Sequence, residues 1–132
     1  MAEKFAAEPV RQTIQGYGDG GFTVSNLRYA GPIAILPFHT QAWDAPADPA
    51  DIDERHLQPI FDELAARPDG VEIVLLGWGK GAMLPPAKLA PLRAALKARG
   101  VSLDGMDTGA ACRTFNLLVG ESRRVAALML PA

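Results

Sequence analysis

The second half of the chain constrains the fold most, because apolar runs of strand type alternate there with segments of helix type. Residues 71–76 are almost continuously apolar and rich in branched side chains, as in strands covered on both faces. Residues 101–106 and 125–130 are two further strand-like runs. The segments between them carry apolar residues at helical spacing: Leu89, Leu92 and Leu96 in one, and Ala111, Phe115 and Leu118 in the other. A short connection that contains a helix makes successive strands parallel, so we expect a βαβαβ unit.

In the first third of the chain, turn-forming residues separate short runs of strand type. Residues that tolerate positive φ occupy the expected turns at positions 18–21 and 25–26. Ala-Gly-Pro at positions 30–32 then breaks the chain before a short apolar strand at residues 33–38. This pattern predicts antiparallel pairing of the N-terminal strands.

A loop and a helix join the two halves. Residues 44–53 contain two prolines and four aspartates, a composition that predicts a loop. Pro59 is tolerated only in the first turn of a helix, so we expect the next helix to begin closer to His56 than to Asp53. Its apolar stripe consists of Leu57, Ile60, Phe61 and Leu64.

A chain of 132 residues can bury one substantial core and is too short for two. We therefore predict a flexible N-terminal tail over residues 1–10 and a single α/β domain over residues 11–132. Helices pack on its mixed β-sheet, which has antiparallel N-terminal strands and the βαβαβ C-terminal half.

Composition argues against several classes of function. The net charge of -2 provides no basic excess for tracking phosphates, so we expect no nucleic-acid partner. The single cysteine rules out an internal disulfide, and no His/Asp/Glu set has metal-binding spacing, so we expect no metal and no cofactor. The N-terminus lacks a targeting pattern, and no segment approaches the roughly 20 apolar residues of a membrane span. We predict a cytoplasmic protein without direct membrane insertion.

A glycine-rich loop after the first apolar strand is one candidate ligand-binding segment. Gly77, Gly79 and Ala82 match the letters of the G-x-G-x-x-[G/A] dinucleotide fingerprint. That fingerprint must open a helix, however, and Met-Leu-Pro-Pro intervenes here at residues 83–86. Lys80 is not followed by Ser or Thr, so the loop is not a P-loop either. The simpler interpretation is a turn that needs glycine for its backbone.

Trp78 lies between the two glycines of this loop. Two roles are open for it: a contact residue for a partner, or a lid over the edge of the sheet.

The second candidate segment is residues 106–116, where polar side chains gather at a strand-to-helix junction. Thr108 is positioned as the N-cap of the helix, directly after Asp107. Arg113 and Asn116 share a helix face and could frame an anion site at the helix N-terminus, where free N–H groups and the dipole favour negative charge. The structural alternative is that they bond loop carbonyls and pair with a nearby acid such as Asp107 or Glu121.

Cys112 lies beside Arg113 in the first turns of the same helix, a position that lowers the pKa of a thiol. A nucleophilic cysteine also needs a base, and the two histidines, His39 and His56, come with no companion acid. The alternative is a small buried thiol that fills space against the sheet. We therefore assign no catalytic residue.

Several motifs taken together resemble a known family. They are Tyr17-Gly18-x-Gly20-Gly21-Phe22-x-Val24, Gly31-Pro32, Pro37, Trp43, Gly77-x-Gly79, the run from Met106 to Asn116, and Glu121-x-Arg123-Arg124-Val125-Ala126-Ala127-Leu128. Over residues 11–130 the chain resembles the small domain of unknown function that mitochondrial respiratory complex I assembly factor 3 shares with an adipogenesis-associated cytosolic protein and with bacterial members.

The resemblance implies a compact three-layer α/β domain with a mixed sheet. It also implies a non-catalytic role, because the mitochondrial relative is an assembly partner for complex I that works with another assembly factor at the inner membrane. Relatives often have Gly-Thr-Gly where this chain has Gly77-Trp78-Gly79, so an indole replaces a hydroxyl in this loop.

Three hypotheses on function follow. The first is a non-enzymatic binding or assembly module that supports respiratory complex I biogenesis, with a protein from membrane-associated assembly machinery as its partner. The alternative is a small anionic-ligand-binding protein or enzyme that uses the crevice between the loop at residues 77–81 and the helix starting at Thr108. The binding residues would then be Gly77, Trp78, Gly79, Lys80, Asp107, Thr108, Cys112, Arg113 and Asn116. The third hypothesis is self-association through the β-rich N-terminal third or an exposed Trp78; the oligomeric state does not follow from the sequence.

Overall fold

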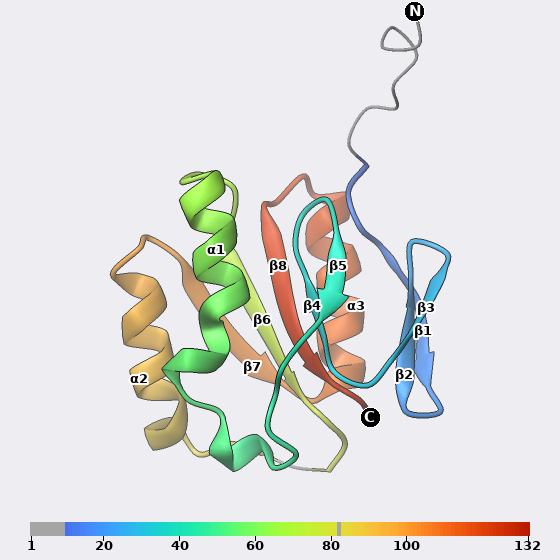
Figure 1. The fold of residues 1–132 in the computed structure, drawn as a ribbon, viewed down its shortest axis with the longest axis horizontal. Coiled ribbons are helices and arrows are strands. Elements are labelled where there is room, and N and C mark those ends of the chain that lie inside the picture. The colour runs from blue at the N-terminus through green and yellow to red at the C-terminus, as the bar shows by residue number, and fades with distance from the viewer. Residues whose placement is uncertain (1–9, 82) are drawn as a thin grey trace, which may run out of the picture.

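The computed structural model describes residues 10–81 and 83–132, so the predicted tail at residues 1–10 lies almost wholly outside the described residues. Two sheets and three α-helices make up this part of the chain (Figure 1). The smaller sheet contains β1 (Ile14–Gly18), β2 (Gly21–Val24) and β3 (Leu27–Ala30) in that order. The larger sheet has the order β5 (Thr40–Ala42), β4 (Ile33–Ile35), β8 (Val125–Leu130), β6 (Ile73–Trp78) and β7 (Ser102–Met106). The helices are α1 (Gln58–Ala66), α2 (Pro86–Lys97) and α3 (Thr108–Gly120), and the short 3-10 helices η2 (Pro49–Asp51) and η3 (Glu54–Leu57) precede α1.

The C-terminal half is the predicted βαβαβ unit, since β6 pairs in parallel with β7 on one side and with β8 on the other. The chain moves from β6 to β7 in one direction, and from β7 back past β6 to β8 in the other. Parallel crossovers are almost always right-handed, so this reversal should place α2 and α3 on opposite faces of the sheet. The packing agrees: Leu92 of α2 belongs to the core on one face, and Phe115 of α3 belongs to the core on the other.

Two apolar cores, one on each face of the larger sheet, hold three layers together (Figure 1). On one face α1 and α2 bury their predicted stripes, including Ile60 and Leu96. On the other face α3 and the smaller sheet enclose Phe22 and Phe115, both fully buried. The predicted three-layer α/β fold is therefore confirmed.

The N-terminal strands divide between the two sheets, which the sequence did not indicate. β1, β2 and β3 form a sheet of their own, whereas β4 and β5 extend the mixed sheet through antiparallel pairing of β4 with β8. The division falls at Gly31, which has φ +77, and at Pro32, which has no N–H to donate. This break ends β3 and redirects the chain into the other layer.

Both predicted N-terminal turns are present as tight hairpins. Asp19 and Gly20 have φ 51 and 75, and Ser25 and Asn26 have φ 47 and 69. Positive φ at both central positions defines the type I′ turn, whose twist matches that of the strands it connects. The pairing of β1 with β2 and of β2 with β3 is antiparallel, as predicted, with one shift of register between Ile14 and Gly16.

The helix after the aspartate-rich loop begins at Gln58, and Pro59 lies in its first turn, as expected. The segment before it is a 3-10 helix with a capping box, in which the side chain of Asp53 accepts from the Arg55 N–H and the Asp53 N–H donates to His56 Nδ1. Among the described residues, no helix is both long and apolar enough to cross a membrane.

An ion-pair cluster ties the start of β6 to the start of β8. Glu72 accepts from the Arg124 backbone N–H at 3.0 Å and from Arg123 Nε at 2.9 Å, and Arg124 Nη1 lies 3.5 Å away. The backbone hydrogen bond from Arg124 and the side-chain hydrogen bond from Arg123 lower the pKa of Glu72 from its ordinary value.

We expect Glu72→Gln to lower stability at neutral pH by about 0.5–1 kcal/mol, as for other partly exposed ion pairs. A carboxylate with a lowered folded-state pKa stabilises the fold above its ordinary pKa and ceases to do so as the pH falls through the lowered value. The difference between the wild type and the variant should therefore shrink in acid, when urea unfolding is followed from pH 7 to pH 2. Glu54→Gln, at an exposed position, is the matched control. A difference that stays constant into strong acid would contradict this assignment.

Candidate functional site

The predicted crevice corresponds to a pocket of about 300 Å³ where the loop after β6 meets the N-terminus of α3. Of the predicted binding residues, Gly79, Lys80, Asp107 and Arg113 line it. Tyr17 of β1, Gly81, Gly109 and Ala132 complete the lining, and none of these four was among the predicted site residues. The remaining predicted residues, Gly77, Trp78, Thr108, Cys112 and Asn116, lie outside this lining.

Thr108 connects three elements through its fully buried hydroxyl. Its Oγ1 accepts from the Gly79 N–H at 2.9 Å and donates to the Leu130 carbonyl at 2.6 Å. The prediction that Thr108 caps α3 is wrong: the N-cap is Asp107, whose Oδ1 accepts from the Ala110 N–H at 2.8 Å. The hydroxyl is turned away from the helix end because the ends of β6 and β8 both require a polar partner at this buried point.

Gly77 is needed for close packing at the same junction. A Cβ on Gly77 would lie 2.6 Å from Met129 Sδ, 3.0 Å from Thr108 Oγ1 and 3.2 Å from Thr108 Cα. The absence of a side chain therefore lets the first turn of α3 approach β6. The glycine at this position is explained by helix–sheet packing.

Trp78 is buried, with only 8% of its surface exposed, and belongs to the core on the α1 and α2 face. Its indole covers Gly105 of β7, the edge strand, where an added Cβ would lie 2.6 Å from Trp78 Cζ3. Of the two roles left open by the sequence, the structure shows the lid over the sheet edge.

Asn116 bonds the backbone of β1 with both ends of its amide. Its Oδ1 accepts from the Ile14 N–H at 2.9 Å, and its Nδ2 donates to the Ile14 carbonyl at 2.7 Å. These bonds connect residues 102 positions apart and fix the smaller sheet to α3. Asn116 therefore has a structural role, in which its partner is the backbone of a strand.

Cys112 is buried between α3 and the sheet and is 4% exposed. Burial raises the pKa of its thiol to about 11, and the neighbouring Arg113 charge opposes the rise only in part. Cys112 also lines a small pocket of about 180 Å³ together with Arg113 and Asn116. A thiol that is neutral and almost wholly buried is a poor nucleophile, so the geometry supports the space-filling role.

We expect native Cys112 to react very slowly with 5,5′-dithiobis(2-nitrobenzoate). With a pKa of about 11, only about one thiol in a thousand is ionised at pH 8. The initial rate should increase at least 100-fold when the protein is unfolded in urea, because unfolding restores both access and an ordinary thiol pKa. Rapid labelling of the folded protein at pH 8 would contradict the buried, neutral state.

Two cations remain exposed at the pocket rim. Lys80 and Arg113 form no ion pair with any residue in the described part of the chain. The Asp107 carboxylate lies at the same helix terminus and already satisfies the Ala110 N–H. With Tyr17, these groups can attract a charged partner, but they form no nucleophile–base pair, and the described residues contain no group of three or more His, Cys, Asp or Glu side chains that could hold a metal.

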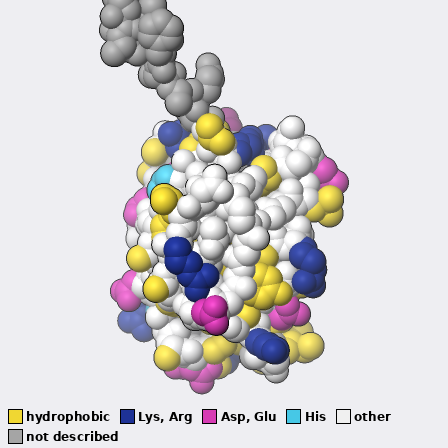
Figure 2. Space-filling model, turned by 90° about the vertical axis from the view of Figure 1, so that its right-hand side faces the viewer, with side chains coloured by type: hydrophobic (Ala, Val, Ile, Leu, Met, Phe, Trp, Pro, Cys, Tyr) yellow, Lys and Arg dark blue, Asp and Glu magenta, His cyan; other side chains and the backbone are white. Residues whose placement is uncertain are grey.

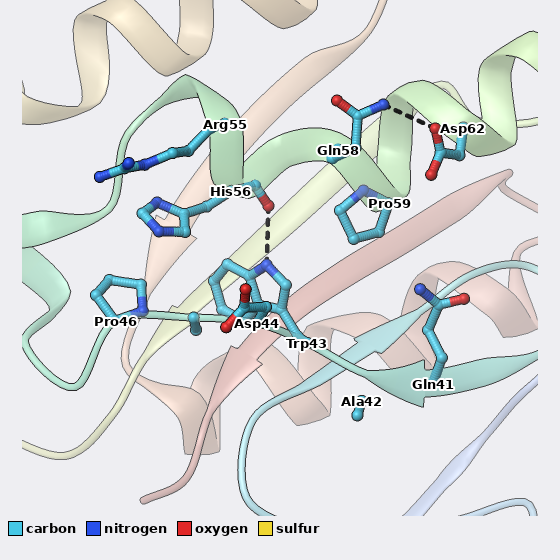
Figure 3. A pocket seen from close by; sticks show the side chains of 11 residues that line it. Gln41, Ala42, Trp43, Asp44, Pro46, Arg55, His56, Gln58, Pro59 and Asp62 are labelled. Carbon is cyan, nitrogen blue, oxygen red and sulfur yellow. Dashed lines mark hydrogen bonds between the residues drawn. The ribbon is translucent and has the colours of Figure 1, made fainter.

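A second, larger pocket of about 490 Å³ lies between the segment after β5 and the start of α1 (Figure 3). It is lined by Gln41, Ala42, Trp43, Asp44, Ala45, Pro46, Arg55, His56, Gln58, Pro59 and Asp62. Trp43 Nε1 donates to the His56 carbonyl at 2.8 Å across the pocket. The sequence analysis missed this pocket: of its lining residues only Trp43 belongs to a recognised motif, and its two walls come from segments that are separated in the chain.

The face formed by the smaller sheet shows no patch of a single charge sign. In Figure 2, the Lys and Arg side chains of this face are interspersed with acidic and hydrophobic ones. A mixed surface of this kind does not present the single-sign field that nucleic-acid backbones require.

Comparison with known proteins places these features in a family. Residues 14–130 match the family model described as "Protein of unknown function (DUF498/DUF598)". NADH dehydrogenase [ubiquinone] 1 alpha subcomplex assembly factor 3 of Bos taurus is 34% identical over 93% of this chain, and the chain spans 62% of that relative's length.

Two solved bacterial structures are similar along nearly their whole length. A crystal structure of a Bordetella parapertussis protein is 36% identical, with a TM-score of 0.75, over 96% of this chain and 100% of that chain. A solution structure of a Bordetella pertussis protein, described as an Mth938-like domain, is 32% identical with a TM-score of 0.72, over 95% of this chain and 88% of that chain. The chain therefore belongs to the DUF498/DUF598 family and has the Mth938-like fold.

Proposed function

We propose that this protein is a non-enzymatic protein-binding module that supports assembly of respiratory complex I. The observation that carries the proposal is its 34% identity to a complex I assembly factor over 93% of the chain. The family model spans residues 14–130, which include both sheets and all three helices, so this domain is a suitable carrier of a binding surface common to the two proteins. We place the protein in the cytoplasm, where it would meet membrane-associated assembly intermediates.

The chemistry of the described residues supports a binding role over a catalytic one. The thiol of Cys112 is buried and neutral, and Thr108 and Asn116 use their polar atoms to join structural elements. Residues that the sequence offered as a reactive cluster are therefore occupied in holding α3 to both sheets. The exposed cations that line the first pocket, Lys80 and Arg113, are suited to partner contact.

The proposed function predicts an assembly defect. Deleting the gene from its native host should reduce the amount of assembled complex I on a blue-native gel severalfold, and should reduce NADH oxidation by membranes in proportion. Re-expression of the wild type should restore both. Cys112→Ala should restore them equally well, because the thiol performs no chemistry in this proposal.

One variant and one contradicting outcome complete this test. Arg113→Ala should change the free energy of unfolding by less than about 0.5 kcal/mol, as for other exposed positions, so loss of function in this variant would identify a contact rather than a folding defect. Unaltered complex I in the deletion strain would contradict the assembly role.

A further inference from the structure

The pocket in Figure 3 is an open groove with two different walls. The extended segment at residues 41–46 forms one wall, and the end of η3 with the first turns of α1 forms the other. Figure 3 shows the hydrogen bond from Trp43 to His56 crossing between these walls, with Gln41 and Asp62 beyond it at one end. The groove therefore runs alongside β5, one of the two edge strands of the larger sheet.

The free edge of β5 carries unpaired backbone groups. The Trp43 N–H donates to the Pro32 carbonyl, and the Leu36 N–H donates to the His39 carbonyl. Bonded and non-bonded pairs alternate in an antiparallel ladder, so Gln41 forms the bonded pair with Ala34 between these two points. The N–H and C=O groups of Thr40 and Ala42 consequently point away from β4, and none of them bonds another described residue.

Within residues 10–81 and 83–132, this edge lacks the devices that usually protect a sheet edge. Charged side chains, proline and covering elements discourage pairing with another chain. The other edge strands have such devices. A charged residue lies on β3 (Arg28) and on β7 (Asp104), and the side chain of Asn116 hydrogen-bonds the backbone of β1. β5 consists of Thr40, Gln41 and Ala42, with neither charge nor proline, and it borders a groove.

The charges in the groove favour a basic occupant. Asp44 and Asp62 are exposed, one on each wall, and neither forms an ion pair within the described part of the chain. Arg55 is the cation of the groove, and its Nε is 3.2 Å from Asp53 Oδ1, so its charge is already paired. Asp62 Oδ1 accepts from Gln58 Nε2 at 2.7 Å, but glutamine is neutral and leaves the carboxylate charge in place. Within the described residues, the groove thus presents two carboxylates whose charges no cation pairs.

We propose that this groove binds an extended segment of a partner protein, which adds a strand to β5 and places a lysine or arginine between Asp44 and Asp62. Main-chain hydrogen bonds to Thr40 and Ala42 provide the pairing, and the two carboxylates select the basic side chain. The inference rests on the proposed function, because it names the surface by which the module holds its assembly partner.

A phage-displayed random-peptide library selected against the full chain tests the proposal. The selected peptides, resynthesised, should contain a Lys or Arg among β-forming residues, and their binding should shift the backbone amide resonances of residues 40–46 and 55–62. Ala42→Pro removes an outward N–H without breaking the β4 ladder, and it should weaken binding at least tenfold. Asp62→Asn should weaken binding three- to tenfold at low salt and less at high salt.

The matched control is Ala30→Pro. The Gly31 N–H donates to the Gly20 carbonyl, so Ala30 lies in the next, non-bonded pair of β3 and also directs its N–H outward from an edge strand. This variant should bind the peptides normally. If Ala42→Pro fails to fold, N-methylation of alternate peptide amides removes the same hydrogen bonds from the ligand side and should abolish binding.

Several outcomes would overturn the groove proposal: no selected peptide, acidic peptides, resonance shifts elsewhere, or binding unaffected by both Ala42→Pro and N-methylation. An assembly partner captured equally by the wild type and Ala42→Pro would also overturn it, while leaving the proposed function intact. Peptides that bind as expected, in a protein whose deletion leaves complex I unchanged, would instead overturn the assembly role and leave the groove standing.

Discussion

Thr108→Val should lower the free energy of unfolding by about 2–5 kcal/mol, the largest loss expected from removing a single atom group in this protein. Valine has almost the same shape as threonine, so the apolar contacts of this fully buried residue remain. The hydroxyl that is lost accepts from the Gly79 N–H and donates to the Leu130 carbonyl. Each backbone group left buried without a partner costs about 1–3 kcal/mol.

Urea unfolding at pH 7, followed by far-ultraviolet circular dichroism, measures this loss. Thr108→Ser keeps the hydroxyl and should lose less than about 1.5 kcal/mol, mostly from the missing methyl group. Thr114→Val makes the same chemical change on the same helix, where the hydroxyl contacts only Met106 Sδ at 3.6 Å, and it should be nearly neutral. A Thr108→Val variant within 1 kcal/mol of the wild type would show that water or a backbone shift replaces the bridge.

The second large loss of stability is expected at the contact between Gly105 of β7 and the indole of Trp78. Gly105→Ala should destabilise the protein by about 2–3 kcal/mol, because its Cβ would lie 2.6 Å from Trp78 Cζ3 and 3.2 Å from Cε3. The indole is a rigid ring packed in the core, so it cannot relieve the overlap by a small rotation. The strand or the ring must therefore move.

A double-mutant cycle isolates this contact. In a Trp78→Leu background the smaller side chain leaves room, and Gly105→Ala should then cost less than about 1 kcal/mol, which gives a coupling of 1–3 kcal/mol. Gly16→Ala is the matched control: it also lies in a strand, and an added Cβ there meets nothing within 4 Å. Equal costs of Gly105→Ala in both backgrounds would exclude the contact with Trp78 as the cause.

These two predictions concern residues that sequence analysis assigned to a ligand site. Thr108 and Trp78 attracted attention because polar and aromatic residues at the ends of parallel strands often contact ligands. The structure places one in a buried hydrogen-bond bridge and the other over an edge strand. Gly79, Lys80, Asp107 and Arg113 do meet at a pocket, as the order of strands and helices predicted, and whether a ligand binds there stays a prediction.

The sequence by itself determined most of the secondary structure, though not β5 or η2, and it determined the parallel C-terminal half. Apolar periodicity records which face of each element is buried, and glycine or proline records where an element ends, so both signals are local. Hence the buried stripe of α2 at Leu89, Leu92 and Leu96, and the positive φ of Gly100 after it, follow directly from residue order.

Only the tertiary structure decided how the N-terminal elements meet the rest of the domain and which buried polar groups become partners. Periodicity does not record the partner of a buried face, so nothing local separates β3 from β4 into different sheets or joins Asn116 to Ile14. The same limit explains why Thr108 was misassigned as a cap: its partners, Gly79 and Leu130, are brought to it by two different strands. The groove beside β5 has the same origin, because its walls become neighbours only when α1 packs on the sheet.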